Sequence, residues 1–284
     1  MALTFTDVTC EYAHGTALAL RALGSVSLSV EPGELVLVLG PTGSGKTTLL
    51  RAAAGLLAPS AGRVEADGVP IAGPGTVRGT VGMLFQRPES QFFALSVEED
   101  CAFGPRNLGR SAEDARSDAR EALDQVGLDA EAFGPREPWT LSGGEARRAA
   151  LAGILAMHPR YLLLDEPTAG LDAAGREAVA AVLEAVRERA GVIVVTHDPD
   201  ALLPRADRVL VLQEGHAAFY GDVPALMGAL SGLATSGAAE PPEVPRTLLL
   251  AQARAGRPAV TPALDVAKAA SAIGRLYSET RVPR

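Results

Sequence analysis

A glycine-rich loop near the start of the chain constrains its fold more than any other feature. Residues 40–47 fit the pattern GxxxxGK[ST], and they lie between the apolar run 35–39 and a helix-forming run at 48–54. In this context the loop points backbone N–H groups and the positive end of a helix dipole at a phosphate. The sequence therefore predicts an α/β fold with a nucleotide phosphate site. The residues assigned to this site are Gly40, Pro41, Thr42, Gly43, Ser44, Gly45, Lys46, Thr47 and Thr48.

Two side chains of this loop have predicted roles of their own. Lys46 is expected to reach the terminal phosphates, and Thr47 is expected to offer its hydroxyl to Mg²⁺. The chain has only one other lysine, Lys268, so the composition does not account for a lysine at this position. The alternative is a glycine-rich turn that binds no ligand, which leaves the full motif and both of its flanks unexplained.

Two further apolar runs end in side chains that suit phosphate chemistry. The run 161–164 precedes Asp165 and Glu166. The run 192–195 is followed closely by His197. Ligands of open α/β sheets gather at the carboxyl ends of strands, so these ends are expected to converge on the loop. Asp165 is predicted to hold Mg²⁺, Glu166 to polarise the attacking water, and His197 to bind the γ-phosphate. The alternatives are carboxylates that only cap a strand end and a structural histidine.

The periodicity of the sequence predicts how the rest of the chain is organised. Serines alternate with apolar residues over 26–30, so the N-terminal segment is expected to form a half-buried antiparallel sheet. Runs rich in Ala, Arg, Glu and Leu predict a helical insertion over about residues 88–159. We expect one nucleotide-binding domain over residues 1–229. Residues 230–284 are expected to form a linker and a small C-terminal helical extension, with a helix start at Thr261.

Composition limits the partners of the chain. Its net charge of −8 opposes binding to nucleic acid or anionic lipid. The N-terminus lacks the features of a signal peptide, and no run approaches the ~20 apolar residues that span a bilayer. Cys10 and Cys101 have no CxxC spacing and suit a reducing compartment. Any role at a membrane is therefore expected to come through partner proteins.

A short segment at 141–145 narrows the function further. It reads LSGGE, precedes a helix-forming run and lies upstream of the run that ends in Asp165. Together with the phosphate loop, Gln86, an AGLD segment that ends at Asp172, and His197, it resembles the motif set of the ATP-binding cassette (ABC) ATPases. The resemblance implies a RecA-like P-loop NTPase core with an antiparallel β subdomain and a helical signature subdomain. The signature residues are Ser142, Gly143, Gly144 and Glu145.

The resemblance also implies that two such ATPases, identical or related, pair head to tail. Each ATP then lies between the phosphate loop of one copy and Ser142, Gly143 and Gly144 of the other. A hydroxyl and backbone N–H groups at a helix start suit an anion. The alternative is that Ser142 is only a helix N-cap, although two successive glycines weaken a helix start. Glu145 stands where many members have glutamine, and this change leaves the phosphate-facing residues intact.

Three further roles follow from the resemblance. Gln86 contacts Mg²⁺ or the lytic water and relays the nucleotide state to a membrane subunit. Asp172 helps to join the two halves of the dimer. Tyr12 stacks on the adenine ring. The alternatives are ordinary polar residues at the first two positions and a core tyrosine at the third. The implied cofactors are ATP and Mg²⁺.

Several segments are similar to the importers of the energy-coupling-factor type, which take up vitamins or nickel and cobalt. They are residues 88–93, 97–109 and 151–157 and the C-terminal tail. The similarity implies two membrane partners, a transmembrane coupling subunit and a substrate-binding subunit, and a place at the cytoplasmic face of the cell membrane. The acidic run 98–100 is expected to offer a negative edge to arginines of such a partner, and a solvated face is the alternative.

Other functions share parts of this motif set. An ATPase of another ABC transporter type would keep all of it. ABC ATPases that act on nucleic acid or ribosomes carry coiled-coil insertions or two cassettes, and this sequence has neither heptads nor a second cassette. A sensor that binds ATP without hydrolysing it would not need Lys46, Asp165 and Glu166 together. The transported solute is not indicated, because no residue of this chain is expected to contact it.

Overall fold

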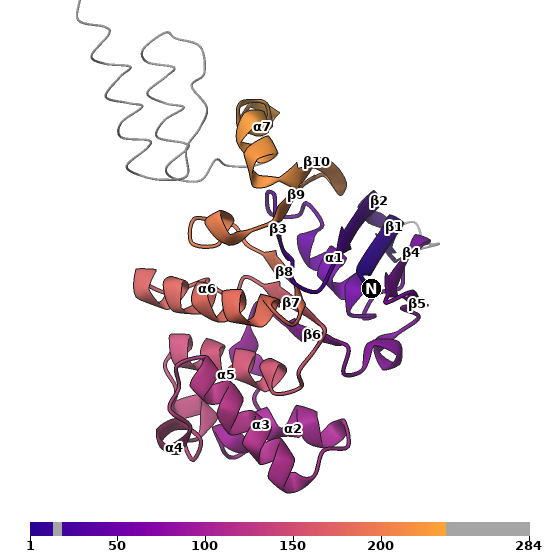
Figure 1. Ribbon diagram of the computed structural model, residues 1–284. Helices are drawn as coiled ribbons and strands as arrows, with labels where there is room; N and C mark the ends of the chain where they lie inside the picture. The colour runs from indigo at the N-terminus through magenta and orange to yellow at the C-terminus, as the bar shows by residue number, and fades with distance from the viewer. Residues whose placement is uncertain (14–18, 237–284) are drawn as a thin grey trace, which may run out of the picture.

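The computed structural model describes residues 1–13 and 19–236, and Figure 1 shows how their elements are arranged. An antiparallel sheet with the strand order β2-β1-β4-β5 forms one side of the molecule. Its strands are β1 (Leu3–Tyr12), β2 (Leu20–Val30), β4 (Ala61–Ala66) and β5 (Val69–Pro70). In β2 the apolar residues over 26–30 are buried and Ser27 is exposed, so the predicted half-buried sheet is confirmed.

A six-stranded sheet with the order β10-β9-β3-β8-β7-β6 forms the centre of the molecule. Its strands are β3 (Leu35–Leu39), β6 (Val81–Leu84), β7 (Tyr161–Asp165), β8 (Gly191–Val195), β9 (Arg208–Gln213) and β10 (His216–Asp222). All neighbours pair in parallel except β9 and β10, which form an antiparallel hairpin. This is the predicted P-loop NTPase core, and it places the carboxyl ends of the parallel strands at one edge.

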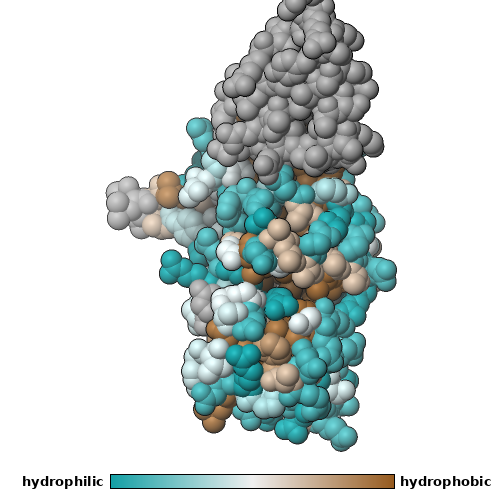
Figure 2. Space-filling model, turned by 90° about the vertical axis from the view of Figure 1, so that its left-hand side faces the viewer, coloured by the Kyte–Doolittle hydropathy of each residue, from teal (hydrophilic) through white to brown (hydrophobic). Residues whose placement is uncertain are grey.

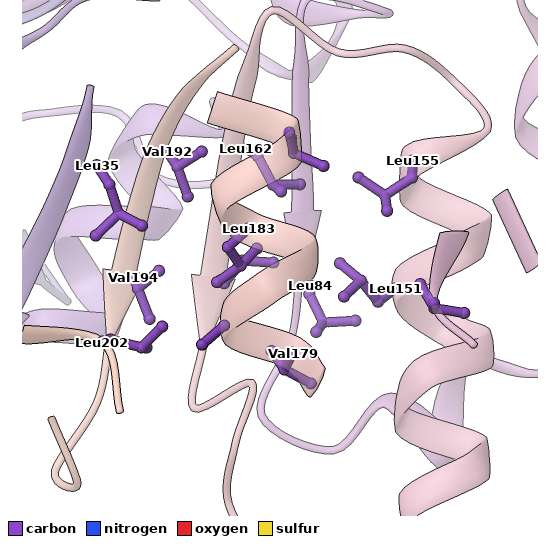
Figure 3. Close-up of a cluster of buried hydrophobic side chains, with 14 of the residues drawn as sticks. Leu35, Leu84, Leu151, Leu155, Leu162, Val179, Leu183, Val192, Val194 and Leu202 are labelled. Carbon is purple, nitrogen blue, oxygen red and sulfur yellow. The ribbon is translucent and has the colours of Figure 1, made fainter. Parts of the chain in front are cut away.

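The central strands are buried on both faces because helices or the antiparallel sheet cover each of them. Every residue of β3, β7 and β8 is buried, as their continuous apolar runs predict. Side chains of β3 alternate between two cores. Leu35 and Leu37 pack with helix α6 (Ala173–Arg187) in the core of Figure 3, whereas Val36 and Val38 pack with helix α1 (Lys46–Ala53) and the antiparallel sheet. Two cores therefore fix the sheet from both sides.

Four helices form a separate part of the molecule between β6 and β7, at the lower end of Figure 1. They are α2 (Val97–Asn107), α3 (Ala112–Gln125), α4 (Ala130–Phe133) and α5 (Gly143–Leu155). Side-chain oxygens cap the starts of these helices, for example Ser96 before α2 and Ser111 before α3. Helices α2, α3 and α5 pack against one another. The helices lie inside the predicted insertion, at about residues 88–159.

The described part of the chain ends in helix α7 (Val223–Ser236), which includes position 229, the expected end of the nucleotide-binding domain. Leu230 and Leu233 of this helix are buried in the core, and this packing stabilises the helix over residues 230–236. The rest of the predicted linker and extension, including the helix start at Thr261, lies outside the described residues.

The surface gives one further observation. On the side that lies at the left of Figure 1, hydrophilic side chains predominate, with patches of hydrophobic residues between them (Figure 2). Within residues 1–13 and 19–236, the helices are too short or too polar to cross a lipid bilayer.

Candidate nucleotide site

Three neighbouring strands bring the predicted phosphate-binding residues to one edge of the central sheet. Strands β3, β8 and β7 are adjacent in that order, so the phosphate loop after β3 lies beside the ends of the other two. Strand β7 ends in Asp165 and is followed by Glu166, whose N–H donates to the Val195 carbonyl at the end of β8 at 2.9 Å. His197 follows the same strand end. The predicted convergence of these three strand ends is confirmed.

Two glycines of the phosphate loop have no room for a side chain. Gly40 has a φ of +141°, and a Cβ there would lie 2.1 Å from the Leu212 carbonyl oxygen. Gly45 has a φ of +102°, and a Cβ there would lie 2.4 Å from the Ala22 carbonyl oxygen. Both residues also take backbone conformations that other residues avoid. The loop therefore packs closely against β2 and β9. Its glycine-rich part ends at Gly45, and α1 begins at the next residue, Lys46.

The ammonium of Lys46 lies folded over this loop. Its Nζ donates to the Gly40 carbonyl at 2.7 Å and to the Pro41 carbonyl at 2.9 Å. Partial burial lowers the pKa of Lys46, and the negative charges of Glu166 and Asp165 act in the opposite direction. The Ser44 Oγ is also buried here, and it has no hydrogen-bond partner among the described residues. A hydroxyl without a partner beside a loop of this shape fits a phosphate oxygen.

Oxygen ligands suited to Mg²⁺ lie next to the loop. The Thr47 hydroxyl donates to the Asp165 carboxylate at 2.8 Å. Both residues line a cleft of about 340 Å³, and Gln86 lines the same cleft. No group of three or more His, Cys, Asp or Glu side chains within the described parts of the chain could hold a metal by itself. This donor set fits Mg²⁺, which takes one or two protein oxygens and completes its shell with phosphate and water.

We expect Asp165→Asn to raise the melting temperature of the protein without nucleotide by about 3 °C. The carboxyl is 3% exposed, and burial raises its pKa, with a further increase from the Glu166 charge. A raised pKa in an acid means that stability falls as the pH rises from the unfolded value through the folded value. At neutral pH the native state therefore carries an unfavourable charge at Asp165. Asparagine removes this charge and keeps an oxygen for the Thr47 hydroxyl. Differential scanning calorimetry measures the change.

The pH dependence provides the control for this expectation. Protonated Asp165 is also neutral, so the melting temperatures of the two proteins should approach each other as the pH falls through the raised pKa of Asp165 toward the ordinary range of an aspartate. If Asp165 binds Mg²⁺ as the sequence predicts, the variant should also lose most of the stabilisation that Mg²⁺ and ATP give to the unmodified protein. A lower melting temperature for Asp165→Asn at neutral pH would show that the site stabilises the charged carboxylate and would contradict the argument.

Glu166 adopts a strained backbone and contacts His197. Its φ is +55°, a conformation that costs residues other than glycine about 1 kcal/mol or more. One oxygen of its carboxylate accepts from the His197 backbone N–H at 3.3 Å and lies 2.9 Å from the imidazole Nδ1. The Glu166 side chain is 9% exposed, whereas the His197 side chain is 70% exposed. The carboxylate is thus held inside the edge, and the imidazole reaches outward from it.

The signature segment lies on the surface of the protein. Ser142 and Gly143 are exposed, and α5 begins directly after Ser142. The Ser142 Oγ accepts from the Glu145 N–H at 3.3 Å, and a Glu145 carboxylate oxygen accepts from the Ser142 N–H at 2.7 Å. Ser142 is thus the N-cap of α5, and with Glu145 it forms a capping box. It does not exclude phosphate binding, because a hydroxyl that accepts can still donate its proton.

The two remaining predicted residues, Tyr12 and Asp172, each make a hydrogen bond at the start of a helix. The Tyr12 hydroxyl lies 3.2 Å from the Thr48 hydroxyl, so the ring is joined to the first turn of α1. Asp172 is the N-cap of α6 and accepts from the Gly175 N–H at 2.7 Å. Its segment approaches the signature, because a Cβ on Gly144 would lie 3.2 Å from the Leu171 side chain. The sequence did not reveal these local contacts.

Sequence reasoning also missed one arginine at this site. Arg147, on α5, donates to the Glu166 carbonyl at 2.6 Å and to the Gln86 carbonyl at 3.4 Å. In the sequence Arg147 is one of two adjacent arginines in a helix-forming run, so neither composition nor periodicity distinguishes it. The contact depends on how α5 docks against the core.

Comparisons with known proteins bear on this arrangement. The family described as "ABC transporter" matches residues 23–169. An energy-coupling factor transporter ATP-binding protein of Symbiobacterium thermophilum is 45% identical over 226 residues, which cover 78% of this chain and 78% of that protein.

Solved structures resemble the fold as well. A dimeric ATP-binding cassette in a post-hydrolysis state, bound to ADP and Pi, has a TM-score of 0.71 and 29% identity, covering 78% of this chain and 98% of that one. The structure of cbiO1 from Clostridium perfringens, described as part of the ABC transporter complex cbiONQ, also has a TM-score of 0.71. It is 32% identical and covers 82% of this chain and 93% of that one.

Proposed function

Because this chain belongs to the ABC transporter family and is an ATP-hydrolysing protein of that family, we propose that it powers an importer of the energy-coupling factor type. The observation that carries this proposal is the 45% identity to an energy-coupling factor ATP-binding protein over 78% of both chains. The solute is then a vitamin or a cobalt or nickel ion, chosen by membrane subunits. The chain would work at the cytoplasmic face of the membrane.

We assign the steps of ATP hydrolysis to the residues at the carboxyl ends of the central parallel strands. The loop from Gly40 to Thr48 binds the phosphates, and the Lys46 ammonium turns from its loop carbonyls to the terminal phosphates. The oxygens of Thr47, Asp165 and Gln86 would hold Mg²⁺, which neutralises charge on the β- and γ-phosphates when bound. Glu166 accepts the proton of the attacking water, and His197 orients the carboxylate and donates to the γ-phosphate. Tyr12 stacks on the adenine.

A second ATPase completes the site. Ser142 and Gly143 are exposed, and the first N–H groups of α5 have no acceptor further back in the helix, although that of Glu145 donates to the Ser142 hydroxyl. In a head-to-tail pair these groups and the Ser142 hydroxyl would bind the γ-phosphate held by the partner's loop. Gly144 and Glu145 shape this start, and Asp172 lies where it can contact the second copy. The pair contains two copies of this chain or this chain and a related ATPase.

An apolar groove offers a place for a membrane partner. It has a volume of about 370 Å³ and lies between β6 and the helices α2 and α5. Phe93 and Phe103 line it with ring centres 4.5 Å apart in an edge-to-face arrangement, and they are 61% and 46% exposed. Exposed aromatic residues in a groove suit an apolar helix face. A helix that extends from the transmembrane coupling subunit is the proposed occupant.

The negative edge expected at residues 98–100 is smaller than the sequence suggested. Both Arg116 and Arg120 on α3 bind the Glu98 carboxylate, at 2.8 and 2.6 Å. An Asp100 oxygen accepts from the N–H groups of Phe93 and Ala94. Glu99 is therefore the acid of this run that is best placed to meet a partner's arginine.

Co-purification and uptake test the proposed function. The chain is purified from its host membranes with the proteins that accompany it and is then reconstituted into liposomes. We expect Lys46→Ala to keep its partners and to lower ATP hydrolysis and uptake by about 100-fold or more.

We expect Phe103→Glu to lose its membrane partners and to keep nucleotide binding, because a charge in an apolar contact is costly. A chain that purifies without membrane proteins, or a Phe103→Glu variant with its full set of partners, would contradict the proposal.

A further inference from the structure

Arg147 joins three segments that are far apart in the sequence. It lies on α5, one turn after the signature segment, and its side chain is partly buried. One guanidinium nitrogen donates to the Glu166 carbonyl at 2.6 Å, and another donates to the Gln86 carbonyl at 3.4 Å. Arginine can make two such contacts at once because its five N–H donors lie in a rigid plane. One side chain thus links the signature helix to the segments that follow β7 and β6.

The backbone conformation of Glu166 has to be held by hydrogen bonds from other segments of the chain. Its φ of +55° is unfavourable for a residue with a side chain, so surrounding contacts must hold it there. The N–H of Glu166 is fixed by the Val195 carbonyl at the end of β8. Its carbonyl accepts from Arg147 at 2.6 Å and from the Ala169 N–H at 3.2 Å, so Arg147 makes the shorter of its two contacts. These bonds together set the direction in which the carboxylate leaves the chain toward His197.

The contact also crosses between two parts of the fold. Helix α5 packs against α2 and α3 in the helical part of the molecule and also against β6, and Glu166 and Gln86 follow strands of the central sheet. A shift of α5 relative to that sheet would therefore move the guanidinium and both carbonyls that it holds. The start of the same helix carries Ser142, which in the proposed function meets the partner's nucleotide.

We propose that Arg147 is a positioning residue that sets the orientation of the Glu166 carboxylate and the Gln86 backbone according to the placement of the signature helix. This inference rests on the proposed function for the roles of Glu166 and Gln86. It adds a physical link between nucleotide bound at the signature of one ATPase and the group that activates water in the same chain.

The neighbouring Arg148 provides a matched control on the same helix. It donates to the carbonyls of Val126 and Gly127, both at 3.3 Å, at the end of α3. Arg148 therefore makes two carbonyl contacts as Arg147 does, but both of them stay within the helical part of the molecule. Removing either guanidinium removes the same charge from α5. Only the loss of Arg147 should disturb the water-activating edge.

The test measures ATP hydrolysis by the complete complex with its membrane subunits, for Arg147→Ala, Arg147→Lys and Arg148→Ala. We expect Arg147→Ala to lower kcat by roughly 10- to 100-fold and to change the KM for ATP less than about threefold, because a small misplacement of a reacting group affects chemistry more than binding. Arg148→Ala should keep kcat within about threefold of the unmodified protein. Millimolar guanidinium should restore part of the activity of Arg147→Ala and should add none to that of Arg148→Ala.

Several outcomes would overturn the inference. They are an Arg147→Ala kcat within about threefold of the unmodified protein, an equal loss in Arg148→Ala, or a loss in Arg147→Ala that guanidinium does not reduce. If Arg147→Ala does not fold, Arg147→Lys decides, because it keeps the charge and loses the second contact, and an unchanged kcat in it would also overturn the inference. A Lys46→Ala control separates the two proposals. If that control still hydrolyses ATP, the proposed function fails instead.

Discussion

Replacing Glu166 by glutamine is expected to lower kcat for ATP hydrolysis by about 1000-fold, within the range that loss of a general base produces. The carboxylate lies at the end of β7 beside His197 and is almost buried, so it is placed to take a proton at the edge where the phosphate loop opens. Glutamine has the same shape, and its oxygen can still accept from the His197 N–H. It cannot accept a proton from water at neutral pH.

Nucleotide affinity separates this effect from damage to the site. The phosphate loop and Lys46 are unchanged in Glu166→Gln, so the dissociation constant for ATP should stay within about threefold. Calorimetric titration measures binding, and phosphate release measures hydrolysis. Glu188→Gln, an exposed position after the end of α6, makes the same chemical change away from the site and should leave both quantities unchanged. Hydrolysis that persists in Glu166→Gln would show that another group activates the water.

The second large effect is expected from Gly143→Asp, which should lower ATP hydrolysis by about 100-fold or more without unfolding the protein. Gly143 is the first residue of α5, it is exposed, and a Cβ built there meets nothing within 4 Å. Its own chain therefore tolerates a side chain, and an acidic residue in the first turn even suits the helix dipole. In the proposed dimer the same carboxylate would face the phosphates held by the partner, and the two negative charges would repel each other.

Oligomeric state distinguishes this mechanism from a local one. In a Glu166→Gln background with ATP, light scattering should find dimers for the parent and monomers for the variant that also carries Gly143→Asp. The melting temperature of this double variant should stay within about 2 °C of the parent, as for an exposed substitution. Gly143→Ala adds bulk without charge and should keep a larger part of the activity. If Gly143→Asp hydrolyses ATP normally, this segment does not meet a nucleotide of a second copy.

The sequence predicted the elements whose cause is local. The phosphate loop needs glycine at Gly40 and Gly45 because carbonyls of β9 and β2 leave no space for a Cβ, and that requirement is visible as a motif. The run 35–39 predicted a strand buried on both faces because every position is apolar. The convergence of the loop with Asp165 and His197 followed from the general position of ligands at the carboxyl ends of parallel strands.

Charges were harder to interpret from the sequence. The acidic run 98–100 suggested a negative surface, but arginines on α3 bind Glu98, and Asp100 holds backbone N–H groups of the preceding loop. The pattern could not show this, because the pairing depends on how α3 lies against α2. The linker pattern after position 229 could likewise not show that burial of Leu230 and Leu233 holds α7 together up to Ser236.

By itself the sequence determined the class of fold and the nucleotide, and it predicted a set of groups that act on it, because motif spacing and apolar periodicity are properties of neighbouring residues. Only the tertiary structure decided which of these groups touch. Thr47 meets Asp165, and Arg147 meets Glu166 and Gln86, through contacts between segments that are well separated along the chain. The first contact needs α1 to pack beside β7, and the second needs α5 to dock on the central sheet. The packing of two hydrophobic cores fixes both arrangements.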